Sequence, residues 1–155
     1  MPILTSGKRA IIYLACPYTD KNPKIRLRRF ELATAAAATL VKRGLVVFSP
    51  ITMTHPMDGA LSGDNTLGSD FWVEFDEAFM EICSEMIILK AEGWEESSGI
   101  QREIEFFKKA GKPVSFMQES DIDPLCLSKP RDVTQASESP AYMLQGYQDN
   151  YRDQC

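Results

Sequence analysis

Histidine is almost absent from this 155-residue sequence, which contains a single one, His55. Cysteine is present four times, but no pair has C-x-x-C spacing; the residues are Cys16, Cys83, Cys126 and Cys155. Structural zinc sites need closely spaced Cys and His ligands, so the sequence predicts no metal site. Two of the cysteines lie within apolar runs, which is typical of reduced core thiols.

The sequence also lacks an excess of basic residues, because it contains 17 Lys and Arg residues and 22 Asp and Glu residues, which gives a net charge of −5. Proteins that bind nucleic-acid polymers normally carry a basic patch, so no such partner is expected. A small anionic ligand stays open, because a few donors suffice for one phosphate. The N-terminal apolar run is too short to span a membrane and shows no clear signal-peptide cleavage pattern, so we expect a cytoplasmic protein without membrane contacts.

What the sequence does contain is an alternation of apolar runs and helical patterns. Buried strands are predicted at residues 10–16, 45–50, 86–90 and 112–117. Helices are predicted from Pro23 to just before Gly44, at residues 69–83, and from Ser98 onward. This order predicts a doubly wound, Rossmann- or flavodoxin-like α/β fold, with a parallel sheet of four to five strands and helices on both faces. The turn after the first strand reads ACPYTDKNP, which is not the glycine-rich dinucleotide motif.

Two segments fall outside the alternation. Residues 51–68 are rich in Gly, Asp, Asn, Ser and Thr and are predicted to form a long loop. Beyond Met117 the sequence turns polar and proline-punctuated. We therefore expect an α/β domain at residues 1–117 and an extension at 118–155. A short last helix is expected from residue 141, packing on the domain or on a partner subunit.

Glu103 occupies an unexpected position in the third predicted helix. Ile100, Ile104 and Phe107 form its apolar stripe, and Glu103 falls on that same face. An unpaired buried carboxylate costs several kcal/mol and is rarely kept without a use. The alternative is a solvated acid that suits the start of a helix.

Other candidates lie near the same cleft, which the carboxyl ends of the strands should form. Asp76 shares a helix face with Trp72 and Phe79, which makes it a second candidate for a functional carboxylate. The alternative is that it lies at the edge of this face and pairs with a basic residue on the surface. Tyr13 lies in an aliphatic strand and by itself is best read as a core tyrosine.

Ser97 and Ser98 lie at the start of the third helix, where Ser98 to Gln101 match a capping box. They are candidates to bind an anion with the helix start, and the alternative is that they are plain N-caps. His55 is a lone loop histidine, and no catalytic role is assigned to it. Two carboxylates and a tyrosine in one cleft suit cleavage of a glycosidic bond.

Three stretches resemble the nucleoside 2-deoxyribosyltransferases and their relatives, the deoxynucleoside 5′-monophosphate N-glycosidases. These are IIYLACPYTD, FDEAFMEICSEMIIL and GWEESSGIQREIEFFKKAGKPV, and the resemblance spans residues 10–117. The last stretch is the most specific, because Ser97, Gly99 and Glu103 match the pattern of the helix that carries the family's nucleophile.

The resemblance implies a role for each matching residue. Glu103 would be the nucleophile on C1′ of the sugar, Tyr13 would steady its carboxylate, and Asp76 would assist protonation of the base. Ser97, with the helix start at Ser98 and Gly99, would bind the 5′ end of the nucleotide. Further expected substrate-binding residues are Thr19, His55 and Trp72. No metal or organic cofactor is implied, and the relatives are homodimers or larger, so residues 147–150 could close a neighbour's cleft.

One departure concerns the phosphate. The phosphate-cleaving relatives carry an arginine where this sequence has Thr19; Lys21, Lys24 or Arg26 could replace it. A serine at position 97 favours a monophosphate and hydrolysis, whereas a missing cation favours a nucleoside and base exchange. Two further hypotheses stay open, a non-catalytic nucleotide sensor and an NAD-cleaving glycohydrolase.

Overall fold

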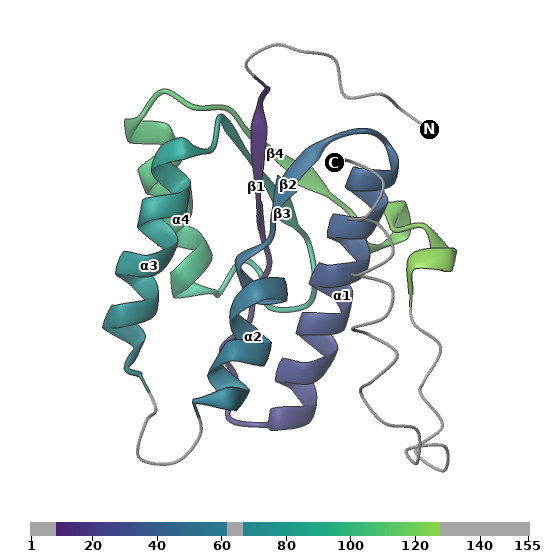
Figure 1. Cartoon of the computed structure of the whole chain (residues 1–155), viewed down its shortest axis with the longest axis vertical. Coiled ribbons are helices and arrows are strands. Elements are labelled where there is room, and N and C mark those ends of the chain that lie inside the picture. The colour runs from purple at the N-terminus through teal and green to yellow at the C-terminus, as the bar shows by residue number, and fades with distance from the viewer. Residues whose placement is uncertain (1–8, 62–66, 128–155) are drawn as a thin grey trace, which may run out of the picture.

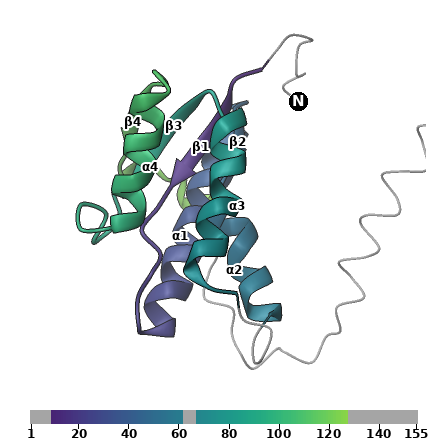
Figure 2. The same cartoon turned by 90° about the vertical axis from the view of Figure 1, so that its left-hand side faces the viewer.

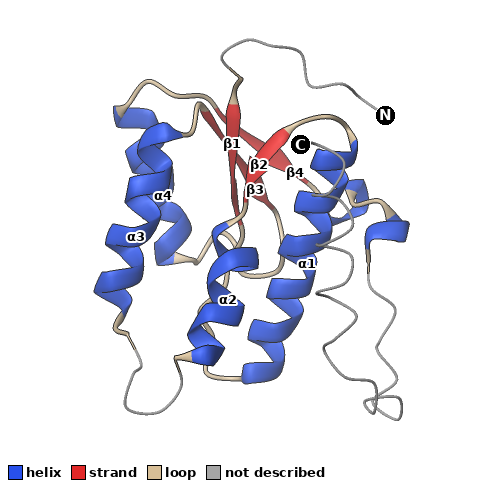
Figure 3. Ribbon diagram, in the orientation of Figure 1, coloured by secondary structure: helices blue, strands red, loops and turns tan. Residues whose placement is uncertain are grey.

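The computed structural model describes residues 9–61 and 67–127 of the chain. Strands and helices alternate along it, as Figures 1 and 3 show. In chain order they are β1 (Ile11–Ala15), α1 (Pro23–Lys42), β2 (Val46–Phe48), α2 (Pro50–Ala60), α3 (Ser69–Ile82), β3 (Glu85–Leu89), α4 (Ser98–Lys109) and β4 (Val114–Met117). Two 3-10 turns follow, η1 (Glu119–Asp121) and η2 (Pro124–Cys126).

The four strands form one parallel sheet in the order β2-β1-β3-β4. The chain moves outward from β1 to β2, then returns to the other side of β1 and continues through β3 to β4. The direction of winding therefore reverses between β1 and β3, which is where ligands bind in open parallel sheets. The doubly wound α/β fold predicted from the sequence is confirmed.

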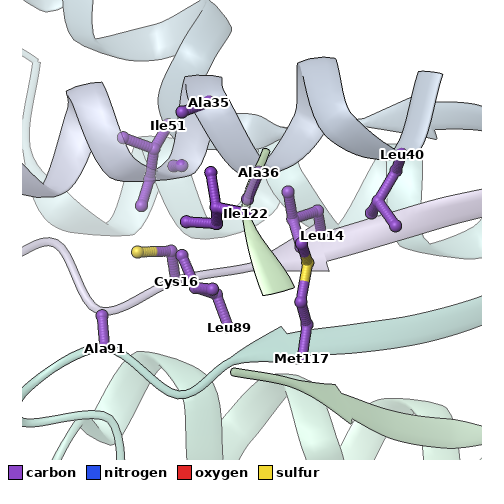
Figure 4. Close-up of a cluster of buried hydrophobic side chains, with 11 residues drawn as sticks. Leu14, Cys16, Ala35, Ala36, Leu40, Ile51, Leu89, Ala91, Met117 and Ile122 are labelled. Atoms are coloured by element: carbon purple, nitrogen blue, oxygen red, sulfur yellow. The ribbon is translucent and has the colours of Figure 1, made fainter. Parts of the chain in front are cut away.

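Helices cover both faces of the sheet, with α1 and α2 on one side and α3 and α4 on the other (Figures 1 and 2). Alternate residues of β1 point to opposite faces, as they do in any strand. Leu14 and Cys16 join the core beneath α1, which Figure 4 shows together with Leu89 and Met117. Tyr13 instead joins the core beneath α3 and α4.

The ends of α1 follow the signals in the sequence. Asn22 caps the helix by accepting a hydrogen bond from the backbone N–H of Lys24 (3.0 Å), and Pro23 occupies the first turn. Gly44 follows the helix with φ +87°, a left-handed conformation that favours glycine. These signals predicted the helix correctly.

The prediction of a loop throughout residues 51–68 is wrong, because Pro50–Ala60 form helix α2. Ser49 occupies the N-cap position and Pro50 the first turn, a pairing that favours a helix start. Ile51 is buried against α1, so apolar packing holds a segment whose composition suggested a loop. Pro56 lies inside the helix, where it cannot donate a backbone hydrogen bond.

At the end of α3, Ile82 is 62% exposed, while the adjacent Cys83 is buried. After Met117 the chain continues to pack on the domain, because Ile122 is buried and the N–H of Asp123 donates to the Thr39 hydroxyl (3.0 Å). The short helix expected after residue 141 lies outside the described residues. Within the described ranges, no helix is long and apolar enough to cross a membrane.

Candidate active site

A pocket of about 870 Å³ lies at the carboxyl ends of β1 and β3. Its walls come from the turn after β1, from α2 and α3, and from the loop that leads into α4. The residues that line it include Thr19, Arg29, Trp72, Asp76, Ser97, Ser98, Gly99, Arg102 and Glu103. The position agrees with the rule for open parallel sheets.

Glu103, which lines this pocket, contacts the buried Tyr13. The Tyr13 hydroxyl donates a hydrogen bond of 2.8 Å to Oε1 of Glu103. The tyrosine is fully buried, and its ring packs against Phe107 (5.6 Å between ring centroids) and Phe48 (5.9 Å). The expected contact between these two side chains is confirmed, and Glu103 is not the solvated acid of the alternative interpretation.

The electrostatics of Glu103 reflect this enclosure. Burial raises the pKa of its carboxyl from 4.5 to about 7; the Tyr13 hydrogen bond and the Arg102 charge act in the lowering direction, and the Asp76 charge in the raising direction. Burial and the negative charge of Glu103 raise the pKa of Tyr13 well above its usual value of 10. Tyr13 therefore stays protonated and remains a donor to the carboxylate.

Asp76 reaches the same pocket from α3. Its Oδ1 atom is buried without a hydrogen-bond partner among the described residues. Burial raises the pKa of Asp76 from 3.8 to about 6, and the Arg102 charge acts in the opposite direction. An unpartnered acid that faces a pocket is available to exchange a proton with a ligand.

The start of α4 forms another wall. Ser97 is the N-cap, and its hydroxyl accepts a hydrogen bond of 3.3 Å from the N–H of Ile100. The capping box predicted for Ser98 and Gln101 is wrong, because Gln101 Nε2 donates to the backbone carbonyl of Glu95 instead. Helix α4 starts one residue after the true cap, so Ser98 and Gly99 present the unpaired N–H groups of its first turn.

The remaining predicted residues divide into two groups. Thr19 and Trp72 line the pocket. His55, expected to bind substrate, is not among the described residues that line the pocket; its Nδ1 is 2.6 Å from the Tyr18 hydroxyl and its ring stacks on Phe30 (4.4 Å). Tyr18 does line the pocket, so His55 contacts a lining side chain.

Arg29 is a pocket residue that the sequence interpretation missed. The three basic residues considered as replacements at Thr19, which are Lys21, Lys24 and Arg26, are not among the pocket's lining residues, whereas Arg29 is. A signal was present, because Arg29 precedes the buried Ala33, Ala36 and Leu40 of α1 at the spacing i, i+4, i+7, i+11. It is a charged residue on a buried stripe, the same pattern that drew attention to Glu103.

Arg102 is exposed, and it also lines the pocket. Its charge acts to lower the pKa of both Asp76 and Glu103. Among residues 9–61 and 67–127, no group of three or more His, Cys, Asp or Glu side chains is arranged to hold a metal ion. Around the Tyr13–Glu103 contact, the pocket thus combines the Asp76 and Glu103 carboxyl groups, two guanidinium groups and the start of α4.

Comparisons with known proteins agree with this fold. The structure is similar to that of the 2-deoxyribosyltransferase from the psychrotolerant bacterium Bacillus psychrosaccharolyticus, with a TM-score of 0.50 and 20% sequence identity over 70% of this chain and 72% of that one. A search of curated proteins found no match. Residues 10–119, which include every site residue discussed above, match a family model described as a domain of unknown function. The chain therefore belongs to the family DUF1937.

Proposed function

We propose that this protein is an enzyme that cleaves the N-glycosidic bond of a deoxynucleoside 5′-monophosphate and releases the free base. The observation that carries the proposal is the partly buried Glu103 carboxylate, which lines the pocket and is held by the Tyr13 phenol at 2.8 Å. A carboxylate that a buried donor fixes in one orientation is suited to attack an electrophilic carbon. Asp76 in the same pocket supplies the second carboxyl group that glycosidic chemistry requires.

In the first step, a Glu103 carboxylate oxygen bonds to C1′ while the C1′–N bond breaks. The electron pair of that bond leaves with the base, and the base takes a proton from Asp76. In the second step, water attacks C1′, the C1′–O bond to Glu103 breaks, and the proton of the water returns to Asp76. The products are the free base and deoxyribose 5-phosphate, and both side chains recover their starting states.

Both reactive carboxyl groups have raised pKa values, about 7 for Glu103 and about 6 for Asp76, so both titrate near neutral pH. In the free protein a single proton is held more strongly by Glu103, and the proposed roles require a bound base to move the preference to Asp76. Tyr13 donates to Glu103 and so stabilises its ionised form. A base lying over Asp76 would displace water from it and favour its protonated form. The reactive state therefore carries one proton, on Asp76.

We propose that the 5′ end of the ligand lies at the start of α4. The hydroxyl of Ser97 and the N–H groups of the first helical turn suit a phosphate, which a carboxylate at position 97 would repel. We place the reaction in the cytoplasm and expect a homodimer or larger assembly. The candidate closing residues, 147–150, lie outside the described part of the chain.

A second candidate is base exchange between deoxynucleosides. The solved structure with a similar fold is a 2-deoxyribosyltransferase, and the first chemical step is the same. The two reactions differ in whether water or a second base attacks the sugar held by Glu103.

Chromatography of reactions with a panel of deoxynucleosides and their monophosphates, with and without an added free base, tests the proposal. Free base plus deoxyribose 5-phosphate is the expected result, and a swapped nucleoside would establish the transferase. Glu103→Ala should abolish base release while nucleotide binding persists. Nucleotide binding without base release by the wild type would support a sensor, and NAD cleavage with inert deoxynucleotides would support a glycohydrolase of different specificity.

A further inference from the structure

Arg29 joins the two loops that flank the switch point of the sheet. Its guanidinium donates to the backbone carbonyls of Thr19 (3.0 Å) and Tyr18 (3.4 Å) in the turn after β1. It also donates to the carbonyl of Glu92 (3.3 Å) in the loop after β3. The side chain is 15% exposed and lines the pocket, so a nearly buried cation connects both loops from inside the site.

The backbone at Gly93 is shaped around this guanidinium. Gly93 has φ +86°, and a Cβ atom placed there would lie 3.0 Å from Nη2 of Arg29. A residue with a side chain would be strained in this conformation and would crowd the guanidinium. The absence of a side chain at Gly93 therefore lets the loop after β3 pack closely against the Arg29 guanidinium.

Charge in the pocket is distributed unevenly. Five acidic side chains line it: Asp58, Asp70, Asp76, Glu96 and Glu103. The described cations on its wall are Arg29 and Arg102, and Arg102 acts on the two reactive carboxylates. An anionic ligand group would be repelled along most of the wall, and Arg29 is the cation that remains for it. The Asp20 carboxylate lies 4.0 Å from the guanidinium and balances its charge in part.

We propose that Arg29 determines specificity for a phosphorylated ligand, an inference that rests on the proposed function and adds the residue that selects its substrate. A guanidinium has five N–H groups, and the three bonds to described carbonyls leave two for a ligand. Paired N–H groups match the geometry of phosphate oxygens. The carbonyls of two loops hold the guanidinium in place before the ligand arrives, so little side-chain entropy is lost on binding.

The test compares Arg29→Gln, Arg29→Lys and a matched control, Arg26→Gln. Arg26 also donates to the carbonyls of Asp20 and Lys21 in the turn after β1, but it does not line the pocket. Each variant is assayed for base release from one deoxynucleoside monophosphate and from the same deoxynucleoside, and circular dichroism checks that it is folded.

We expect Arg29→Gln to lower kcat/KM for the monophosphate by about 100-fold and for the nucleoside by less than about fivefold. Arg29→Lys should fall between, because it keeps the charge and loses the paired donors. Arg26→Gln should leave the ratio between the two substrates unchanged. Equal losses on both substrates in Arg29→Gln, or the same change of ratio in Arg26→Gln, would overturn the inference.

Calorimetric binding of the same monophosphate separates this inference from the proposed function. Binding that weakens about 100-fold in Arg29→Gln, without base release by the wild type, would support the specificity role and refute the glycosidase. Base release by the wild type at equal rates from the monophosphate and the nucleoside would support the glycosidase and refute the specificity role of Arg29. A wild-type protein that does not bind the monophosphate would refute the role of Arg29.

Discussion

The Tyr13 hydroxyl lies 2.8 Å from Oε1 of Glu103, although the two residues are 90 positions apart in the chain. Tyr13 comes from the inner strand β1, whereas Glu103 comes from α4 on one face of the sheet. The doubly wound topology brings them together, because the loop after β3 starts α4 next to the end of β1. The hydrogen bond is thus a consequence of the strand order, and it gives the first prediction.

Tyr13→Phe should shift the pH profile of base release. The phenol stabilises ionised Glu103, so its loss raises the pKa of that carboxyl further above about 7. The rising limb of kcat/KM, which follows ionisation of the nucleophile, should move to higher pH, with an activity loss of roughly tenfold or more near pH 6.5 that narrows by pH 9. A pH–rate series measures this, and an unshifted limb would contradict the role of Tyr13.

Glu103→Gln should stabilise the fold at alkaline pH. The folded pKa of Glu103 is raised, from 4.5 to about 7, so its contribution to stability is fully present below about pH 4.5 and is lost as pH rises through about 7. The variant avoids burying this charge and should gain about 2 kcal/mol over wild type at pH 8.5, but not at pH 4. Urea unfolding at both pH values measures the difference. The exposed Glu105→Gln on the same helix should show none.

Asp76→Asn should discriminate between leaving groups. The variant cannot donate a proton, so release of an ordinary purine should fall by roughly 100-fold. A 7-methylated purine already carries a positive charge and leaves without protonation, so its release should fall by less than about tenfold. Comparing kcat for the two nucleotides measures the effect, and equal losses would show that Asp76 only positions the base.

Ser97→Ala and Ser98→Ala should differ in stability, because only Ser97 caps α4 through its side chain. Loss of an N-cap hydroxyl costs about 1 kcal/mol, so Ser97→Ala should lower the free energy of unfolding by that amount. Ser98 is exposed, and its replacement should change the free energy by a few tenths of that. Urea denaturation of both variants tests the assignment. A larger loss of unfolding free energy in Ser98→Ala than in Ser97→Ala would indicate that Ser98 is the N-cap, as the capping box predicted.

Thr39→Val should reveal whether the segment after β4 belongs to the folded unit. The buried Thr39 hydroxyl accepts the N–H of Asp123 and donates to the carbonyl of Ala35. Valine keeps the volume but leaves that N–H without its partner, which should cost about 1–2 kcal/mol. Lys42→Met, which removes the exposed ion pair to the same Asp123, should leave the unfolding midpoint unchanged. No loss in Thr39→Val would favour an independent extension from residue 118.

The sequence predicted the sheet and its helices well, because buried parallel strands and amphipathic helices have distinct apolar periods. It failed at α2, where glycine and polar residues suggested a loop, but burial of Ile51 and a Pro50 helix start decided otherwise. Local propensity is a weak guide when tertiary packing opposes it.

Within the site, the stripe pattern of α4 identified Glu103, and the same pattern on α1 would have identified Arg29 had it been applied there. The cap at Ser97 could not be separated from Ser98, because neighbouring serines have equal capping propensity. The missing partner of Asp76 Oδ1 depends on how α3 sits over the pocket, which no residue spacing records.

Tyr13 also has a structural role, since its ring packs between Phe48 and Phe107 while its hydroxyl contacts Glu103. Any replacement at position 107 that lets this ring tilt would move the phenolic oxygen, and so would alter turnover from a position that never meets a ligand. Substitutions at buried positions around Tyr13 should therefore lower the reaction rate before they lower the melting temperature appreciably.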